Sequence, residues 1–356
     1  MPLNTSGPIA IGGSVVGQSI NLEIGRISVS SSNLNETALR SLAGKAAGLI
    51  GLSNFYGKSG GSIHAYFCGG RTSSLNTTCV AEIDGINFTT NAAINPTAAL
   101  SAARAGVAGA SAQGANIGHI GGGVNTSSVY VTTIDQFLFS AQICTVVSDT
   151  LSAARWSTAA FSNGISKSYW TGGYNGVSYF NEIDGVTTAG TAFNPAATLA
   201  VARSGLTSAA SSTVGYAMGG DASGTSQSEI DGLIFSSETA TNPSATLTVA
   251  RSDPYGLNSQ TKGYAISGIA SGTVQTEIDG IQFSTETSIN PSAVIATGVF
   301  GHAGASHYDW GYTSGGRTIP TAAYNTVNKF FYPTETMTVM AATLATARAG
   351  LGGIAG

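Results

Sequence analysis

Charge is scarce in this chain of 356 residues, because Asp, Glu, Lys and Arg together make up 9% of it and the formal net charge is -4. A nucleic-acid-binding surface needs a basic stripe, so this composition argues against a nucleic-acid partner. The sequence also has no run of 18 apolar residues, which argues against membrane insertion. The opening residues lack the basic and apolar regions of a signal peptide, so we expect synthesis in the cytoplasm without one.

Cysteine and histidine are equally sparse. The three cysteines, Cys68, Cys79 and Cys144, do not form a disulfide framework. Cys68 and Cys79 could face each other across a hairpin, but two small buried thiols are the favoured interpretation. The histidines stand at positions 64, 119, 302 and 307, and no two of them share a loop at ligand spacing. We therefore expect no metal and no cofactor, with calcium at oxygen-rich loops as a lesser alternative.

Glycine, in contrast, is abundant, with 48 residues, and many of these belong to a repeat. A Gly doublet or its remnant is followed by Ile-Asp or a variant at 83-84, 134-135, 183-184, 230-231, 278-279 and 327-328. Successive acidic or Asn positions lie 51, 49, 47, 48 and 49 residues apart. A fixed period of this length indicates a repeat architecture.

Each period has the same parts in the same order. An Arg follows each Asp by about twenty residues, at positions 104, 155, 203, 251 and 348, and Val299 is the one substitution. Small and β-branched residues and closely spaced turn signals predict strands instead of long helices. Asp-Gly, as in Asp279-Gly280, predicts a type I′ hairpin turn. Four short strands in each period predict a blade of a β-propeller.

The ends of the chain predict how the ring closes. The first doublet, Gly69-Gly70, has no Arg unit before it, whereas Arg348 near the C-terminus has no doublet strand after it. We therefore expect the C-terminal segment to supply the inner strand of the first blade, which pairs the two ends and leaves no open edge. The predicted fold is all-β: a six-bladed propeller over residues 61-356 with ring closure by the C-terminal strand, after a small N-terminal module with one short helix over residues 1-60.

The repeat resembles the kelch repeat. The resemblance rests on the spacing from Arg203 to Gly219 and on Tyr216 just before the doublet, and it covers residues 61-356. The chain departs from that family in lacking its regular late Trp, with Phe or Tyr nearby instead. Members of the kelch family include copper-radical oxidases, but the histidine spacing here argues against that chemistry.

Residues 1-60 do not share the repeat. Asn35 is a plausible N-cap of a short helix that ends near Gly44, and its face with Leu39 and Leu42 must dock on something. The segments Asn4-Ile9, Arg40-Gly44 and Leu52-Ser59 resemble the N-terminal module of tailed-bacteriophage virion proteins, such as the structural proteins of cyanophages. This resemblance implies docking to the particle, for which Leu39, Leu42, Phe55 and Tyr56 are the candidate residues.

The Glu and Asp of Glu-Ile-Asp raise the question of a glycan depolymerase, which needs two carboxylates at a defined separation. Here Glu-Ile-Asp recurs in nearly every blade, so we interpret it as scaffold and expect no enzyme. Where the repeat is broken, we expect ligand or partner contacts. The candidates are Arg71 and Arg317 for a carboxylate or phosphate, His307, Tyr308, Asp309 and Trp310 in an exposed turn of blade six, and Trp170 and Tyr174 in blade three.

Taken with these features, the resemblance of residues 1-60 implies a structural component of a phage tail (fibre, collar or baseplate-associated) made in the host cytoplasm. The propeller would bind a host-surface glycan or receptor or another virion protein, and the chain is expected to be a homo-oligomer within the particle. Two alternatives stay open: a purely architectural virion protein, such as a tail nozzle or decoration protein, and a depolymerase.

Overall fold

The computed structural model describes residues 64-319 and 323-356. Two compact units are distinguished: residues 65-86 and 93-356 form the larger one, and 87-92 group with residues 1-64. The short helix expected near residues 35-44, and the docking candidates Leu39, Leu42, Phe55 and Tyr56, lie outside the described residues. The fold below is that of the larger unit.

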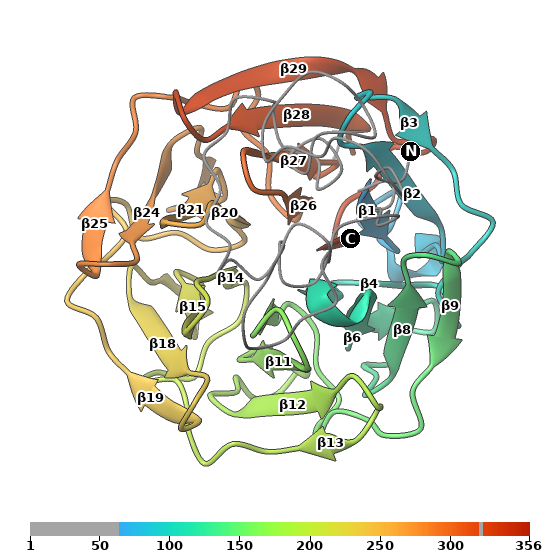
Figure 1. The fold of residues 1–356 in the computed structure, drawn as a ribbon, viewed down its shortest axis with the longest axis horizontal. Coiled ribbons are helices and arrows are strands. Elements are labelled where there is room, and N and C mark those ends of the chain that lie inside the picture. Colours follow the sequence, from blue (N-terminus) through green and yellow to red (C-terminus); the bar gives the residue numbers. More distant parts are fainter. Residues whose placement is uncertain (1–63, 320–322) are drawn as a thin grey trace, which may run out of the picture. The chain divides into compact units, whose positions relative to one another are not determined.

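Six four-stranded antiparallel sheets stand around a common centre and form a β-propeller (Figure 1). Blade one consists, from the inside outward, of β30 (Gly352–Ala355), β1 (His64–Cys68), β2 (Ile83–Asn87) and β3 (Ala93–Ile94). Blade two consists of β5 (Ala108–Ala112), β6 (Ile117–Gly121), β8 (Ile134–Leu138) and β9 (Ile143–Val146). Blade three consists of β10 (Ala159–Ser162), β11 (Lys167–Thr171), β12 (Ile183–Thr187) and β13 (Ala192–Phe193).

The other three blades follow the same order. Blade four consists of β14 (Thr207–Ala210), β15 (Val214–Met218), β18 (Ile230–Ile234) and β19 (Thr239–Thr241). Blade five consists of β20 (Tyr255–Asn258), β21 (Lys262–Ile266), β24 (Ile278–Gln282) and β25 (Thr287–Ile289). Blade six consists of β26 (Ala303–Ser306), β27 (Trp310–Ser314), β28 (Thr326–Phe331) and β29 (Thr336–Thr343).

Smaller elements decorate the blades. Three two-stranded ladders pair β4 (Arg104–Ala105) with β7 (Val124–Asn125), β16 (Asp221–Ala222) with β17 (Thr225–Ser226), and β22 (Ile269–Ala270) with β23 (Thr273–Val274). Helical structure among the described residues is limited to two 3₁₀ turns, η2 (Asn76–Thr78) and η3 (Gln113–Ala115). The expected all-β fold with six blades is confirmed.

The ring closes through the C-terminal strand, as the sequence predicts. Strand β30 pairs antiparallel with β1, with Tyr66 opposite Ile354 and Cys68 opposite Gly352. The innermost position of blade one is thereby filled by a segment more than 280 residues away in the chain. Pairing the two ends covers the edge of the blade that would otherwise be open.

The expectation that Asp-Gly forms hairpin turns is wrong. In each blade that has it, this dipeptide lies inside the third strand: Asp231 pairs with Ala217 and Gly232 with Tyr216 in blade four. Tertiary structure overrides the local turn propensity because the Asp side chain has a buried partner. Glycine follows because its missing side chain leaves room for a neighbour, which is Thr241 in the case of Gly232.

That buried partner is the repeat Arg. Each ion pair lies within one blade, with both side chains at most 7% exposed, and the pairs are Arg104 with Asp135, Arg155 with Asp184, Arg203 with Asp231, Arg251 with Asp279 and Arg348 with Asp84. The Arg also binds the backbone just after the second strand, for example by donating from Nε of Arg203 to the carbonyl oxygen of Gly219 at 2.8 Å. The repeated Arg and Asp residues are thus paired parts of the scaffold.

The Gly doublets join each blade to the next. Gly219 and Gly220 have φ values of 63° and 114°, a region that favours glycine. The N–H of Gly220 donates to the carbonyl oxygen of Arg251, in the next blade, at 2.9 Å. A Cβ on Gly219 would lie 2.8 Å from the same oxygen, so the close approach requires glycine. Equivalent bonds run around the ring.

Aromatic residues provide a second link between blades. Tyr216 of blade four stacks on Phe283 of blade five, with ring centroids 5.5 Å apart and an angle of 5° between planes. Its hydroxyl donates to Glu286 of the same neighbour at 3.0 Å. Tyr169 on Phe235 and Tyr264 on Tyr332 repeat this arrangement, with Glu238 and Glu335 as acceptors. The Phe and Tyr residues found in place of the kelch Trp therefore hold adjacent blades together.

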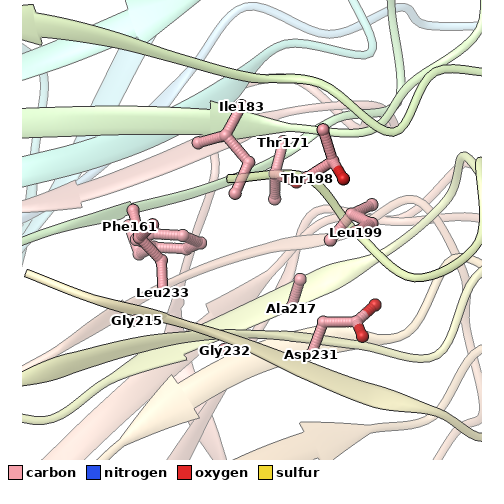
Figure 2. Close-up of a pocket in the computed structure, with 10 residues that line it drawn as sticks. All are labelled: Phe161, Thr171, Ile183, Thr198, Leu199, Gly215, Ala217, Asp231, Gly232 and Leu233. Atoms are coloured by element: carbon pink, nitrogen blue, oxygen red, sulfur yellow. The ribbon is translucent and has the colours of Figure 1, made fainter. Parts of the chain in front are cut away.

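The seams between blades are closely packed. Figure 2 shows the crevice between blades three and four, lined by Phe161, Leu199 and Leu233, with Asp231 at one end. It is too narrow to admit a water molecule, so it is packing space and not a ligand site. The three cysteines are free thiols; Cys68 and Cys79 are buried, as the favoured interpretation predicts.

Candidate functional site

The chain leaves the second strand of every blade at one face of the propeller, which we call the doublet face. There the residue after each doublet pairs with the residue after a repeat Arg position. These pairs are Arg71 with Ala349, Val124 with Ala105, Tyr174 with Trp156, Asp221 with Ser204, Ile269 with Ser252 and Arg317 with Phe300. The backbone is equivalent in all six blades, whereas the side chains differ. On this face, therefore, each blade presents different side chains on an equivalent backbone.

Arg71 and Arg317, which we call the arginine pair, lie in adjacent blades at equivalent positions. The backbone between them is continuous through hydrogen bonds: Arg71 pairs with Ala349, Arg317 pairs with Phe300, and Gly350 donates to Gly301. Burial lowers the pKa of Arg71, and the positive charge of Arg317 lowers it further. The structure thus brings together the two arginines that the sequence singled out.

Each guanidinium is held in place from one side. Nη1 of Arg71 donates to Oδ1 of Asn76 at 2.7 Å, and its Cζ lies 5.6 Å from the ring centroid of Trp156. Cζ of Arg317 lies 4.7 Å from the ring centroid of Phe300. Stacking on aromatic rings orients a guanidinium while leaving N–H groups available for an anion.

Asp253 of blade five lies on the doublet face next to Ser252, and its carboxyl group is beside Gly205. Its φ is 50°, and its N–H donates to the carbonyl oxygen of Gly205 at 2.7 Å. Burial raises the pKa of Asp253, the charge of Arg317 and then of Arg71 acts in the opposite direction, and Asp221 adds to the rise. Asp253 therefore lies within electrostatic range of both arginines.

Aromatic side chains of blades two and three continue this surface; we call Tyr130, Trp156, Tyr174 and Tyr179 the aromatic arc. The ring centroids of Tyr130 and Trp156 are 6.3 Å apart, and those of Tyr174 and Tyr179 are 4.7 Å apart. The hydroxyl of Tyr179 donates to Oδ1 of Asp221 at 2.9 Å. All four rings are partly exposed.

The candidates in blade six lie at the opposite end of the blade. Because β26 and β27 form a hairpin with Ala303 opposite Ser314, the turn with Tyr308 and Asp309 is separated from Arg317 by the length of β27. His307 and Trp310 are only 6% and 8% exposed, so the expectation of an exposed turn is wrong for these two. Nζ of Lys329 lies 4.1 Å from the ring centroid of Trp310, which explains part of this burial.

Trp170 is also corrected. It is fully buried in β11, and its Nε1 donates to the carbonyl oxygen of Ala108 in blade two at 3.1 Å. The ring fills space over Gly121, where a Cβ would lie 2.7 Å from it. Trp170 therefore packs blade three on blade two and cannot reach a ligand, whereas Tyr174 lies on the doublet face.

Sequence reasoning missed three members of this face: Trp156, Asp253 and Tyr130. The first two carried a signal, because Trp156 directly follows a repeat Arg where Ala, Ser or Phe stands elsewhere. Asp253 likewise occupies a position held by Gly in four units and by Ser157 in one. Tyr130 lies in a loop without repeat equivalence, so the sequence offered no comparable signal.

Comparison of the chain with known protein families and curated proteins does not assign a function to this face. No protein-family model matches the chain, and no curated protein matches it either. Over residues 64-319 and 323-356, no group of three or more His, Cys, Asp or Glu side chains is placed to hold a metal ion. The same residues include no helix that is long and apolar enough to cross a membrane.

Proposed function

We propose that this protein is a structural and binding component of a phage tail (fibre, collar or baseplate-associated), made in the host cytoplasm, whose propeller contacts a host-surface glycan or a neighbouring tail protein. The virion assignment is supported by the resemblance of residues 1-60 to the N-terminal module of tailed-phage virion proteins. In this proposal residues 1-60 dock the chain to the particle, where several copies assemble.

A binding role is supported by one observation on the doublet face. The backbone pairing there is the same in all six blades, whereas the side chains differ from blade to blade. The repeat Arg and Asp residues are paired inside the blades, with nitrogen-oxygen distances of 2.6 to 2.8 Å in four of them. The six residue pairs of the doublet face all differ, and four of them contain a guanidinium, carboxylate or aromatic group. Aromatic and Arg residues are enriched where proteins recognise partners.

Binding is favoured over catalysis for the same reason. A depolymerase needs an acid and a base at a defined separation with access to substrate. The repeated Asp carboxylates are at most 7% exposed and bound to Arg, which favours their structural role. We therefore propose a non-enzymatic protein.

The test combines particle association with glycan binding. The full chain should co-purify with assembled virions and, as a purified protein, bind a subset of host-surface glycans on an array without releasing sugar. Association with virions but no glycan or host binding would leave the architectural alternative. Release of reducing sugar from host envelope would identify a depolymerase and contradict the proposal.

A further inference from the structure

We propose that the doublet face binds an acidic saccharide, with a carboxylate or phosphate oxyanion of the sugar held between Arg71 and Arg317 and the sugar beside the aromatic arc. This inference rests on the proposed binding function and specifies its ligand. It follows from the charge and the hydrogen bonding of the arginine pair, taken with the chemistry of the surface around it.

The arginine pair differs from the other described arginines in its lack of a counter-ion. All five repeat arginines have a carboxylate within ion-pair distance. Among residues 64-319 and 323-356, no carboxylate oxygen lies within 4.0 Å of the guanidinium of Arg71 or Arg317. Two like charges that interact across a partly buried surface destabilise each other unless an anion joins them.

The hydrogen bonds leave the guanidinium groups able to receive that anion. Arg71 uses Nη1 for Asn76, and Arg317 is oriented by Phe300 through a ring contact. A planar guanidinium binds a carboxylate or phosphate through two parallel N–H···O bonds. In this proposal the guanidinium groups of Arg71 and Arg317, from two adjacent blades, bind the same oxyanion.

Asp253, on the same face in blade five, is the carboxyl group whose pKa responds to the charges of Arg317 and Arg71. Its carboxylate is within electrostatic range of Arg317 and Arg71 but forms no ion pair with either at the 4.0 Å limit. It therefore weakens the positive field of the pair without occupying it, and an incoming anion has to approach an existing negative charge. Removing that charge should strengthen anion binding.

The surroundings favour a saccharide over an acidic peptide. Sugar rings stack on aromatic side chains, and four rings of the aromatic arc lie on the side of blades two and three, with Trp156 in contact with Arg71. Sugar hydroxyls need polar partners at the same surface, and Asn76 and Asp221 provide them beside Arg71 and Tyr179. Arg clusters also recognise acidic peptide motifs, so the experiment includes an acidic peptide as a competing probe.

The experiment measures binding of the full chain to defined probes by calorimetry. The probes are trigalacturonic acid, its neutral methyl ester, sialyllactose, mannose 6-phosphate and triglutamate. Binding of an acidic sugar with at least a tenfold preference over the neutral ester is expected, because charge-assisted hydrogen bonds are lost in the ester. The preference between the carboxylated sugars and mannose 6-phosphate identifies the source of the oxyanion.

Variants connect the binding to these residues. Arg317→Gln should weaken it about tenfold or more, and Arg71→Lys should weaken it less because the charge is kept while the fork is lost. Asp253→Asn should strengthen it several-fold, an effect that a loss of folding cannot imitate, and Asn tolerates the positive φ of this position. Leu75→Gln is the matched control, since Leu75 is 63% exposed in the same loop as Arg71 and carries no charge.

Three results would overturn the inference: no preference for any acidic sugar over the neutral ester, unchanged affinity in Arg317→Gln, or equal binding of triglutamate. These failures are distinguishable from failure of the proposed function. If the chain binds virions and neutral host glycans regardless of the arginine pair, the binding function stands and this inference fails. If the chain neither joins virions nor binds any glycan, the proposed function itself fails.

Discussion

Blade six and the other five blades fill the same two buried positions with different residues. Where the others have a buried Arg and Asp, blade six has Val299 and Asn328, which are 4% and 6% exposed. Nδ2 of Asn328 lies 3.4 Å from the hydroxyl of Thr313 and needs no cation. Both members of the ion pair are thus exchanged together, and neither charge is left alone in the interior.

The seam next to blade six changes as well. Ser267 stands where the other doublets begin with Gly, and its Oγ accepts from the N–H of Val299 at 2.9 Å and contacts the carbonyl oxygen of Val299 at 2.6 Å. The side chain therefore bonds the very segment from which the Arg is missing. The comparison teaches that the repeated charges are parts of a scaffold and can be replaced only as a set.

The largest effect is expected where the ring itself is broken. Deleting residues 350-356 removes β30 and exposes an edge of blade one, whose Arg348–Asp84 pair spans the closure. The cooperative unfolding transition should be lost or shifted strongly downward in thermal denaturation. A Val177→Ser control, at a position 87% exposed, should melt like the unmodified protein. An unchanged melting temperature after the deletion would contradict closure by the C-terminal strand.

Removing one charge of a blade pair should come next. Asp231→Asn leaves Arg203 buried without its carboxylate, and breaking a buried pair in this way costs about 3–5 kcal/mol. Asn328→Asp in blade six should also destabilise, because it buries a carboxylate where Val299 offers no cation. Urea denaturation measures both. Stability of Asp231→Asn within error of the unmodified protein would mean that the carboxylate is not a scaffold element.

His302 permits a pH-dependent test within blade six. Burial lowers the pKa of His302 to about 3, and both ring nitrogens lack a hydrogen-bond partner among the described residues. The unfolded chain, with an ordinary pKa near 6.5, then binds the proton first, so stability falls as the pH drops below about 6.5.

Leu206 occupies the equivalent position in blade four, so His302→Leu gives blade six the same residue. This variant should no longer lose the stability that His302 costs at low pH. The advantage of the variant in unfolding free energy should grow by about 1.4 kcal/mol per pH unit below about pH 6. His119, whose pKa burial lowers to about 4, is present in both proteins and cancels. A pH-independent difference would show that His302 is not buried as a neutral ring.

The smallest effect concerns the link between blades. Tyr216→Phe keeps the stack on Phe283 and removes only the hydrogen bond to Glu286, so a loss of about 0.5–1.5 kcal/mol is expected. Burial raises the pKa of Tyr216 strongly, which keeps the hydroxyl protonated as a donor. Thermal denaturation at neutral pH measures the loss, and Tyr216→Ala, which also removes the stack, should cost more. If Tyr216→Phe and Tyr216→Ala lose equal stability, the stacking of Tyr216 on Phe283 does not stabilise the protein.

Much of this fold was predictable because its information is periodic. The spacing of Ile-Asp units gave the number of blades, and the mismatch between Gly69 and Arg348 gave the closure. The placement of Asp231 was not predictable from local sequence, since Asp-Gly favours a turn in isolation and only the distant Arg203 makes a strand position favourable. The burial of Trp170 also depended on an adjacent blade.

The candidate site was predictable in part. Arg71 and Arg317 were identified because they interrupt the repeat, and the ring brought them together. Asp253 and Trp156 interrupt it too, but their positions follow the repeat Arg and become part of the doublet face only through the pairing of distant segments. The turn around Asp309 was misjudged because its exposure depends on packing that no local pattern reveals.

A double-mutant cycle tests the central claim that the paired charges form a single scaffold unit. Arg203→Val, Asp231→Asn and the double variant, which gives blade four the residues of blade six, are compared by urea denaturation. Each single change should be costly, and the double variant should be more stable than their sum predicts by about 2 kcal/mol or more, because no buried charge is left without its partner. Additive losses, within about 0.5 kcal/mol, would contradict the claim.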